Sequence, residues 1–314
     1  MSLSLLLVSL FTIVEFNCEN LFDTRHDTLK LDQEFLPTSD YHWTPTRYWR
    51  KLSRVGQALA ATGEVSGTML LPDLAVLTEV ENGSVTRDLC CRSLLRTAGF
   101  RWVMTDSPDE RGIDVALLYS PLSFRLLSYS FVRVTPPLDF QPTRDILYAA
   151  GMVATGDTLH VVGVHAPSRR NGELASRPYR MAVARAVCQL VDSVTANSHH
   201  PLIVVTGDFN DYSESPAILE LVKHGLTEVS KDAVGSHGAR GSYRYHGEWR
   251  SIDHLLCNDA LVRRFVSCRI GDAEFLLEKD KKYGGVKPRR TYLGPRYLGG
   301  TSDHLPLVTV FDVQ

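Results

Sequence analysis

Short apolar runs rich in β-branched residues recur along this chain, a pattern typical of interior β-strands. The expected strands are residues 11–17, 74–78, 114–119, 146–154, 159–165, 202–205, 252–257 and 305–311. Some of them follow one another closely enough to form hairpins. The pattern therefore predicts strands that pair into sheets.

Other segments repeat apolar residues at helical spacing and alternate with the strands. The first of these helices lies between Pro45 and Gly63, and the second ends at Gly99. A third begins at Pro178, and a short fourth begins at Pro216. Proline just inside a helix start and glycine just past a helix end are the expected signals. Helices that alternate with strands in this way predict an α/β protein with two packed sheets and helices outside.

Two long segments, residues 24–46 and 271–300, show neither pattern. Loops of this length in a compact domain are usually functional or mobile. We therefore expect them either to contribute to a site or to move.

The overall charge narrows the class of protein. The chain has 314 residues, 44% of them hydrophobic, and a formal net charge of -2, which is ordinary globular composition. A protein that coats nucleic acid would be markedly basic, so that class is excluded. An enzyme that contacts only a few phosphates needs positive charge only locally.

The cysteines and the opening segment indicate whether the chain binds zinc and whether it crosses a membrane. The six cysteines form no CxxC pair, so zinc is not expected and buried free thiols are. Residues 1–14 are apolar but lack the Lys or Arg of a signal peptide and are too short to cross a bilayer. We expect no membrane span. The compartment stays open, because the protein is either cytoplasmic or exported after removal of a signal peptide.

Polar side chains stand at the ends of several expected strands. Asp303 and His304 precede the last strand, Asn17 and Glu79 lie at the ends of two earlier ones, and Asp208 follows another. A carboxylate can hold a divalent cation, and an imidazole can face a phosphate. If these strand ends converge, the sequence predicts a site for phosphoester cleavage.

Each signal has a structural alternative when it is taken alone. Glu79 by itself is typical of a surface acid at a strand end. Asp208 and Asn210 are turn formers, next to a glycine that allows a sharp turn. His165, at the end of its strand, is by itself more often a structural residue than a catalyst.

Two further features favour a site. Asp253 lies inside an apolar run and needs a partner, for which His304 is a candidate. Such pairing fixes the tautomer of the imidazole and favours its charged form. Ser168 follows His165 in the same loop, and a hydroxyl is a natural phosphate contact.

Taken in order, these segments resemble the endonuclease/exonuclease/phosphatase superfamily. The resembling segments are Phe16-Asn17-Cys18-Glu19-Asn20-Leu21-Phe22-Asp23, Leu77-Thr78-Glu79-Val80-Glu81-Asn82, Arg111-Gly112-Ile113-Asp114-Val115-Ala116, Val164-His165-Ala166-Pro167-Ser168, Gly207-Asp208-Phe209-Asn210, Ser251-Ile252-Asp253-His254 and Ser302-Asp303-His304. They cover almost the whole chain. The resemblance implies a single domain, residues 1–314, folded as a four-layer α/β/β/α sandwich with two mixed sheets face to face and helices outside.

The resemblance also implies a divalent metal, Mg²⁺ with Mn²⁺ as a substitute, at one open end of the sheets. Glu79 matches the main metal ligand, Asn17 the amide that helps to set the metal site, and Asp303 a further acidic ligand. Mg²⁺ suits such a site because it binds few protein oxygens and keeps several waters.

Catalytic roles follow from the same resemblance. Asp208 matches the carboxylate that orients or deprotonates the attacking water, and Asn210 matches its partner at the scissile phosphate. His304 matches the phosphate-facing imidazole, paired with Asp253, and His165 takes the place of a second phosphate contact. Asp208 and the His304–Asp253 pair both qualify as the general base, and Asp208 is favoured.

Substrate contacts are expected from Ser168, Arg111 and Arg290. Asp114 either orients His165 or forms an ion pair with Arg111. The basic segment that ends at Arg290 either grips substrate phosphates or is a solvated loop.

Substrate identity is less constrained, because the superfamily cuts DNA, RNA, sphingomyelin and inositol phosphates with one kind of site. Thr206 and Asp211 stand where inositol phosphatases carry a Trp and a basic residue, which argues against that class. The segment that begins at Asn17, together with residues 111–116, looks most like a bacterial branch of nuclease-like hydrolases.

The leading hypothesis is a Mg²⁺-dependent phosphodiesterase of nuclease type, whose partner is a phosphoester substrate such as nucleic acid. The enzyme alternatives are a phosphomonoesterase and a sphingomyelinase-type phosphodiesterase. The non-enzyme alternative is a binding module on the same scaffold, against which the presence of Glu79, Asp208 and His304 argues. No protein partner is evident.

Overall fold

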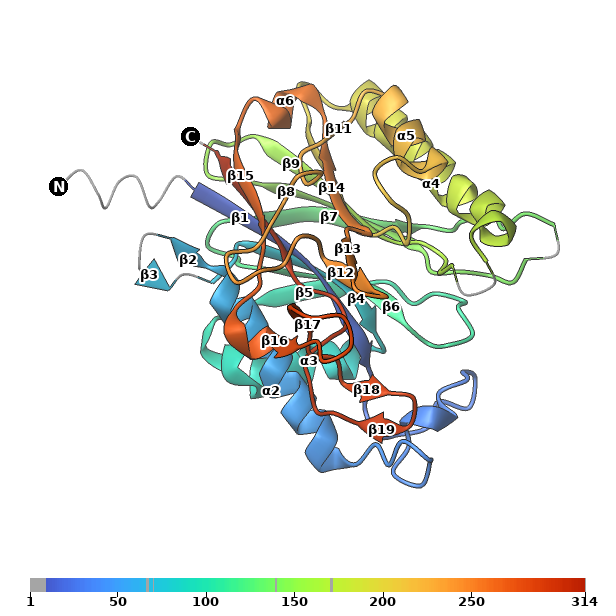
Figure 1. The fold of residues 1–314 in the computed structure, drawn as a ribbon. Coiled ribbons are helices and arrows are strands. Elements are labelled where there is room, and N and C mark those ends of the chain that lie inside the picture. The colour runs from blue at the N-terminus through green and yellow to red at the C-terminus, as the bar shows by residue number, and fades with distance from the viewer. Residues whose placement is uncertain (1–9, 66–67, 70, 139, 170–171, 314) are drawn as a thin grey trace.

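Two six-stranded mixed sheets pack face to face in the middle of the molecule (Figure 1). The computed structural model describes residues 10–65, 68–69, 71–138, 140–169 and 172–313, so most of the apolar opening segment lies outside the described residues. Helices cover the outer faces of the sheets. The predicted α/β sandwich with helices outside is confirmed.

The first sheet has the strand order β15-β20-β1-β4-β6-β5. Its strands are β1 (Leu10–Leu21), β4 (Leu74–Val80), β5 (Arg101–Met104), β6 (Asp114–Tyr119), β15 (Phe265–Ile270) and β20 (Leu307–Asp312). Strand β1 is parallel to β4 and antiparallel to β20. The first and last strands of the chain are therefore neighbours.

The second sheet has the order β11-β14-β10-β9-β8-β7. Its strands are β7 (Arg125–Val132), β8 (Ile146–Met152), β9 (Thr158–His165), β10 (Leu202–Asp208), β11 (Thr227–Glu228) and β14 (Asp253–Cys257). Strand β10 is parallel to β9 and antiparallel to β14. Each sheet thus combines a parallel pair with an antiparallel neighbour.

Alternate residues of β9 and β10 belong to two different hydrophobic cores. Val161 and Val204 belong to the larger core, which includes strands of both sheets. Val162 and Val205 belong to a second core together with the apolar side of a long helix. Successive side chains of a strand point to opposite faces, so these strands are buried on both sides, as their continuous apolar runs predicted.

Four helices accompany the sheets. The helices α2 (Pro45–Thr62) and α3 (Gly83–Arg92) lie on the side of the first sheet, whereas α4 (Glu173–Asn197) and α5 (Pro216–Lys223) lie on the side of the second (Figure 1). A single further turn, α6 (Asp259–Val262), precedes β15. The helices predicted to begin at Pro45 and Pro216 are confirmed at their first residues.

The predicted start of the third helix was wrong. Helix α4 begins at Glu173, and Pro178 lies inside it. Ser176 Oγ donates to the carbonyl oxygen of Gly172 at 2.7 Å, and the guanidinium of Arg180 donates to Ser176 Oγ at 2.7 Å. These bonds hold the turn that precedes the proline, although the proline itself has no N–H to donate.

The predicted second helix is divided. Helix α3 ends at Arg92, and a separate 3₁₀ helix, η2 (Leu94–Thr97), follows it. Ser93 stands between them in an extended conformation, and its Oγ accepts the N–H of Leu95 at 3.1 Å. A serine that caps a new turn in this way competes with continuation of the helix.

Short hairpins and 3₁₀ turns fill the segments between the main elements. They are β2 (Glu64–Val65) with β3 (Thr68–Met69), β12 (Tyr243–Tyr245) with β13 (Glu248–Arg250), β16 (Leu277–Lys279) with β17 (Val286–Pro288), and β18 (Tyr292–Leu293) with β19 (Arg296–Tyr297), together with η1 (Gln33–Phe35) and η3 (Glu274–Leu276). The segment 271–300, expected to be irregular, therefore contains two hairpins, and β17 packs against β12.

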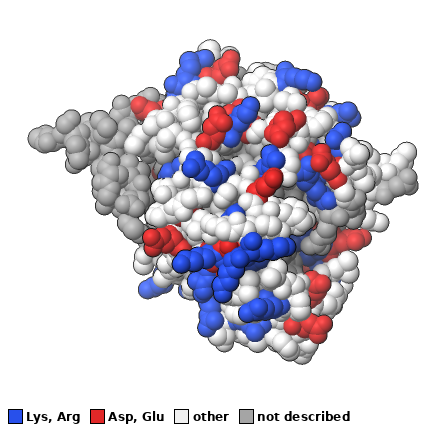
Figure 2. Space-filling view, in the orientation of Figure 1, with Lys and Arg blue, Asp and Glu red and all other residues white. Residues whose placement is uncertain are grey.

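Both signs of charge are spread over the face of the molecule in Figure 2, with a band of Lys and Arg across the region of α2, β17 and β18. No helix among the described residues is long and apolar enough to cross a membrane. All six cysteines are free, as predicted.

Candidate active site

Six strand ends meet at one edge of the sandwich. The parallel strands β1 and β4, and likewise β9 and β10, end at the same edge of their sheets. Their antiparallel neighbours β20 and β14 begin there. The polar residues at these strand ends therefore come together across the two sheets, although they are far apart in the sequence.

Glu79 lies at an irregularity in β4, where the pairing with β6 shifts register between Thr78 and Val80. Its φ of 59° is unusual for a residue with a side chain. Glu79 Oε2 accepts the N–H of Asn20 at 2.8 Å, and Oε1 lies 3.6 Å from the guanidinium of Arg111. Such bulges often re-aim a side chain next to an active site, and here the carboxylate faces the edge of the sheets.

Asp208 is buried at the end of β10 and held by two amides. Its Oδ2 accepts from Asn17 Nδ2 at 2.9 Å and from Asn210 Nδ2 at 3.1 Å, and its Oδ1 accepts the N–H of Asn210 at 2.8 Å. Burial raises the pKa of Asp208 to about 7, and Asp253 adds to this, while His304 and the amide bonds oppose it. The carboxyl group is therefore fixed in place, and its pKa lies well above that of an ordinary aspartate.

Gly207 explains why β10 can lie so close to β9. A Cβ built on this residue would lie 1.8 Å from the carbonyl oxygen of Val164, and its φ is 150°. Only glycine fits this approach. The glycine that the sequence suggested for a sharp turn instead brings Asp208 beside His165, with which it is paired in the sheet register.

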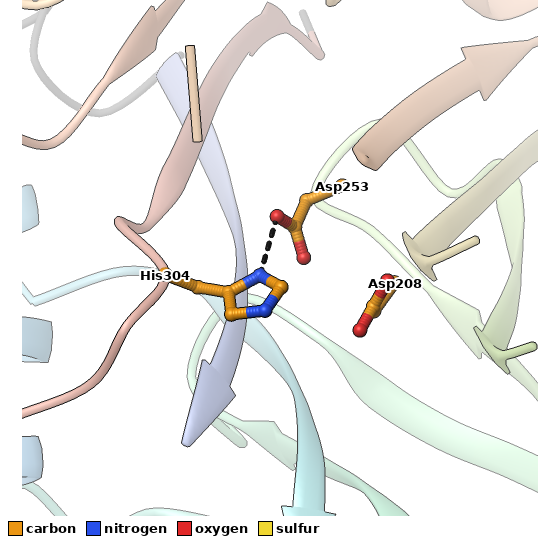
Figure 3. Close-up of side chains that lie close together, drawn as sticks. All are labelled: Asp208, Asp253 and His304. Carbon is orange, nitrogen blue, oxygen red and sulfur yellow. Dashed lines mark hydrogen bonds and ion pairs between the residues drawn. The ribbon is translucent and has the colours of Figure 1, made fainter. Parts of the chain in front are cut away.

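His304 and Asp253 form the predicted pair. His304 Nδ1 and Asp253 Oδ2 are 2.8 Å apart, and Asp208 lies next to the imidazole as well (Figure 3). Ser302 Oγ accepts the N–H of His304 at 3.0 Å and donates to the carbonyl oxygen of Asn17 at 2.7 Å, which ties the imidazole to β1. Burial alone lowers the pKa of His304, but Asp253, Asp208 and Asp303 together raise it well above its ordinary value. The imidazole is therefore charged.

His165 joins the two carboxylates of the site. Its Nε2 lies 3.8 Å from Glu79 Oε1 and 3.7 Å from Asp208 Oδ2. Burial lowers the pKa of His165 well below its ordinary value, and the positive charges of Arg144, Arg111 and His304 lower it further. This imidazole is therefore neutral.

The arginines predicted to contact substrate are both close to acids of the site. Arg111 donates to Asn20 Oδ1 at 2.5 Å as well as facing Glu79. Arg290 donates to Asp303 Oδ2 at 2.9 Å and lies 3.4 Å from Glu19 Oε1. Their side chains keep about a third of their surface exposed, at 34% and 35%, so both remain open to a ligand.

Ser168 is exposed in the loop after β9. Its neighbour Arg169 does not point freely into solvent, because it pairs with Glu173 at 2.6 Å and lies over the ring of Tyr212 at 4.2 Å. The expected contact between Ser168 and a phosphate stays a prediction.

Neither interpretation of Asp114 was right. Its Oδ1 accepts from the hydroxyl of Thr105 at 2.6 Å and from the N–H of Ser107 at 3.0 Å. His165 Nδ1 has no hydrogen-bond partner among the described residues, so Asp114 does not orient it. Arg111 pairs with Glu79 instead. The reason is that Asp114 faces β5 and the loop that follows it.

Several residues of the site were not singled out from the sequence. Glu15 is fully buried on β1, where its carboxyl group lies beside that of Asp253. Burial raises its pKa well above the ordinary value, and Asp253 and Asp208 raise it further, so it carries a proton. Its position in the middle of an apolar run was a signal that could have found it.

Arg144 was also missed. It is buried beside the site, where it pairs with Asp109 at 3.0 Å and donates to the carbonyl oxygen of Ala166 at 2.8 Å. The same carbonyl oxygen accepts from Asn210 Nδ2 at 3.1 Å. Nothing in the local sequence distinguishes Arg144 from a surface arginine at the start of a strand.

The donor set fits a hard divalent cation, because carboxylate and amide oxygens are the ligands that Mg²⁺ prefers. Asp208, Asp253 and His304 lie close enough together to hold a metal ion. His304 could ligate a metal only through a nitrogen that carries no proton, so a cation in that cluster would compete with protonation of the imidazole. Glu79 offers a further carboxylate at the same edge of the sheets.

Solved structures with the same fold include proteins of different activities. An endonuclease/exonuclease/phosphatase family protein from Bacteroides thetaiotaomicron is 14% identical, with a TM-score of 0.63, 97% of this chain and 98% of that chain being covered. A mannosyl-6-phosphatase from the same organism is 14% identical, with a TM-score of 0.62 and 95% and 98% covered. Truncated TDP2 from Caenorhabditis elegans is 14% identical, with a TM-score of 0.59 and 97% and 98% covered. At these identities the likeness shows the fold alone.

The fold, together with the acids and imidazoles at its strand ends, defines a phosphoester hydrolase. The profile of the endonuclease/exonuclease/phosphatase family matches residues 12–312. The chain therefore belongs to this family and is an enzyme of the phosphoric ester hydrolase class. No curated protein sequence matches it.

Proposed function

We propose that the chain is a Mg²⁺-dependent phosphodiesterase of nuclease type. The observation that carries the proposal is the position of His165 Nε2, 3.8 Å from Glu79 and 3.7 Å from Asp208, together with the imidazole of His304 beside Asp208 (Figure 3). In this proposal Glu79 acts as a cation-binding carboxylate, Asp208 as a basic carboxylate and His304 as a charged imidazole around one phosphate.

Asp208 is the general base of the proposed reaction. A pKa of about 7 means that its carboxylate is present at neutral pH and is basic enough to accept a proton from water. Asn17 and Asn210 hold both of its oxygens, so the base is oriented before substrate arrives. Such preorganisation avoids reorganisation during the reaction.

His304 supplies positive charge to the reacting phosphate. Its bond to Asp253 uses Nδ1, which leaves Nε2–H free to donate to a phosphate oxygen. His165 adds a neutral hydrogen-bond donor on the opposite side. The charged ring stabilises the extra negative charge of the transition state more than that of the ground state, which is the condition for catalysis.

Glu79, Asn17 and Asp303 are the proposed residues of the metal site. When bound, the divalent cation offsets negative charge on the phosphate and on the leaving oxygen. Asn17 Oδ1 accepts the N–H of Glu19 at 2.8 Å and keeps a second lone pair. Arg111 and Arg290 flank this group and are proposed to bind the non-reacting phosphate oxygens, with Ser168 at the rim.

The experiment is hydrolysis of bis-p-nitrophenyl phosphate with Mg²⁺ or Mn²⁺, with and without a chelator. We expect turnover that the chelator abolishes, and Asp208→Asn is expected to lower turnover by about 10²-fold. Turnover that persists in chelator would contradict the metal-dependent mechanism. Cleavage of p-nitrophenyl phosphate without cleavage of the diester would favour a phosphomonoesterase instead.

Glu81→Gln is a matched control for Glu79→Gln. Glu79 lies near the end of β4, and Glu81 follows directly after this strand. Glu81 accepts the N–H of Asp23 at 2.6 Å, whereas Glu79 faces the other site residues. Burial raises the pKa of Glu81 to about 8, so glutamine closely imitates its protonated form. We expect Glu79→Gln to lose metal-dependent turnover and Glu81→Gln to keep it. A panel of DNA, RNA and sphingomyelin then separates the nuclease from the lipid-directed alternative, and a folded protein inactive on every ester would be the binding module.

A further inference from the structure

A groove runs from the candidate active site along the hairpins β12–β13 and β16–β17. Its cavity has a volume of about 270 Å³. Asp303 and Arg290 line its inner end, and Tyr243 lines it next to them, with its ring 5.1 Å from the ring of His304. The backbones of Tyr243 and His304 also form a β-bridge. The groove is therefore continuous with the site of the reaction.

Aromatic side chains line the outer part of the groove. The rings of Tyr245 and His246 are stacked, with centroids 4.0 Å apart and planes 12° apart. The ring of Tyr283 continues the series at 6.4 Å from His246. Tyr245 is 58% exposed and Tyr283 is 44% exposed, so their surfaces are available to a ligand.

The two hairpins hold these rings rigidly. His246 and Gly247 both have positive φ angles, 49° and 86°, as the two central residues of a tight hairpin turn of type I′ require. A Cβ built on Gly247 would lie 2.7 Å from Cβ of Tyr283, so glycine lets the second hairpin pack on this turn.

A buried arginine forms the floor. Arg244 donates to the carbonyl oxygens of Gly247 at 3.0 Å and Gly284 at 2.9 Å, and also to that of Val286. Its guanidinium lies 3.6 Å from Asp280. Arg244 thus joins β12–β13 to β16–β17 and is not itself free to bind a ligand.

Positive charge continues beyond the groove. Lys282 lies 4.8 Å from the centre of the Tyr283 ring, and Lys287 lies in the groove wall. Burial lowers the pKa of Arg54, and the like charges of Arg289 and Arg50 contribute, which places these three guanidinium groups near one another. Figure 2 shows a band of Lys and Arg over the region of α2 and β17. A ligand that carries several phosphates fits this surface better than a lipid with one.

We propose that this groove binds bases of a nucleic-acid strand next to the scissile phosphate, by stacking on the exposed rings of Tyr245 and Tyr283, the two ends of the series that His246 joins. The inference rests on the proposed function, since the scissile phosphate is placed at Asp208 and His304. Aromatic rings bind every base through its flat face, so the subsite holds the strand without selecting a sequence. The basic band then receives neighbouring phosphates of the same strand.

The test compares two fluorescent single-stranded oligonucleotides of equal length and charge, one with bases and one with abasic spacers. Their dissociation constants are measured by anisotropy in chelator, so that no cleavage intervenes. We expect the wild-type protein to bind the base-containing strand about 5- to 150-fold more tightly, the range for one stacked base. Equal affinity for the two strands would overturn the proposal.

Variants show whether the groove is responsible. The double variant Tyr245→Ala/Tyr283→Ala is expected to reduce the ratio of the two affinities to near 1 while leaving the abasic strand unaffected. Tyr245→Phe/Tyr283→Phe should keep the ratio, because the rings remain. Tyr129→Ala removes a tyrosine that is 52% exposed on β7 and should also keep it. A ratio that survives the double alanine variant would place the base elsewhere and overturn the proposal.

The proposed function and the proposed base-binding groove can be contradicted independently of each other. A protein that hydrolyses bis-p-nitrophenyl phosphate with metal but binds both strands equally is a phosphodiesterase without this subsite. A protein that shows the predicted affinity ratio but no turnover has the subsite and contradicts the proposed function. Both tyrosines are exposed, so the melting temperature of the double variant should match that of the wild type.

Discussion

His304 and His165 have different neighbours in the folded protein, and the local sequence around each histidine does not show this difference. Both imidazoles are buried at strand ends, and both lie near Asp208. Carboxylates surround His304, whereas His165 is close to the guanidinium groups of Arg144 and Arg111 as well as to two carboxylates. Burial lowers both pKa values, but the acids reverse this for His304 and the arginines reinforce it for His165.

The comparison teaches that one residue type performs two tasks in a single site. A charged imidazole stabilises negative charge, and a neutral imidazole donates a hydrogen bond without repelling a cation nearby. His165 lies 3.8 Å from Glu79, which is proposed to hold the metal, so a neutral ring is suited to that position. Neighbours, rather than burial, determine the division of labour.

The largest expected effect separates the two histidines. His304→Ala should lower turnover by about 10²-fold or more, because it removes a charge that acts on the transition state. His165→Ala should cost about 10-fold, the effect of one neutral hydrogen bond. Steady-state kinetics on bis-p-nitrophenyl phosphate measures both, with circular dichroism to confirm folding. Equal losses would show that the two imidazoles do not differ as described.

The next effect is the dependence of turnover on pH. Asp208 acts without its proton, and its raised pKa of about 7 means that activity falls as the pH falls through that region. His304 acts with its proton, and its raised pKa means that activity falls only at a pH well above its ordinary value. The profile of kcat/KM is therefore bell-shaped, changing about tenfold per pH unit on each side.

A bound cation lowers the pKa of a neighbouring carboxylate, so the acid side of this profile should move to lower pH as Mg²⁺ increases. In the Asp208→Asn variant the acid side should disappear and the alkaline side should remain. An unchanged acid side in this variant would assign that ionisation to another group.

A smaller effect on turnover is expected when Asp253, the carboxylate paired with His304, is replaced. Asp253→Asn removes its nearest negative charge, so the pKa of His304 should fall while that of His165 hardly changes. Turnover should fall by about 10-fold, since less of the enzyme carries the charged ring. Titration of the two imidazole rings by NMR measures this directly. A His304 pKa that did not move would mean that Asp208 and Asp303 suffice to charge it.

The smallest expected effect comes from Arg111. Arg111→Gln removes one of the positive charges that lower the pKa of His165, so this pKa should rise modestly. The Michaelis constant should rise by about fivefold, as expected for one partly exposed contact with a phosphate. The same NMR titration and steady-state kinetics measure the two changes. Arg125→Gln is a suitable control, because Arg125 is an exposed residue on β7.

Much of the fold could be predicted because its signals are local. Apolar runs marked the central strands of both sheets, and Pro45 and Pro216 marked two helix starts. The start of α4 could not be predicted from Pro178, because contacts of Ser176 and Arg180 hold the turn before it. Local patterns thus identified elements more reliably than their boundaries.

The candidate site likewise has features that could be predicted from the sequence and features that could not. The pairing of Asp253 with His304 was predicted because a lone acid in an apolar strand requires a partner. The ion pair of Arg111 with Glu79 was not predicted, because Asp114 was the only partner considered for Arg111 and the bulge in β4 that aims Glu79 is not visible in the sequence. Glu15 and Arg144 were missed because their roles depend on residues that only folding brings near them.

The amino-acid sequence by itself determined the family, the strands and the chemical groups at their ends, because these depend on residue type and order along the chain. Only the tertiary structure decided which groups touch and which imidazole is charged. The physical reason is that pKa values and ion pairs depend on distance and burial, and residues far apart along the chain, such as Asn17 and Asp208, become neighbours only when the two sheets pack.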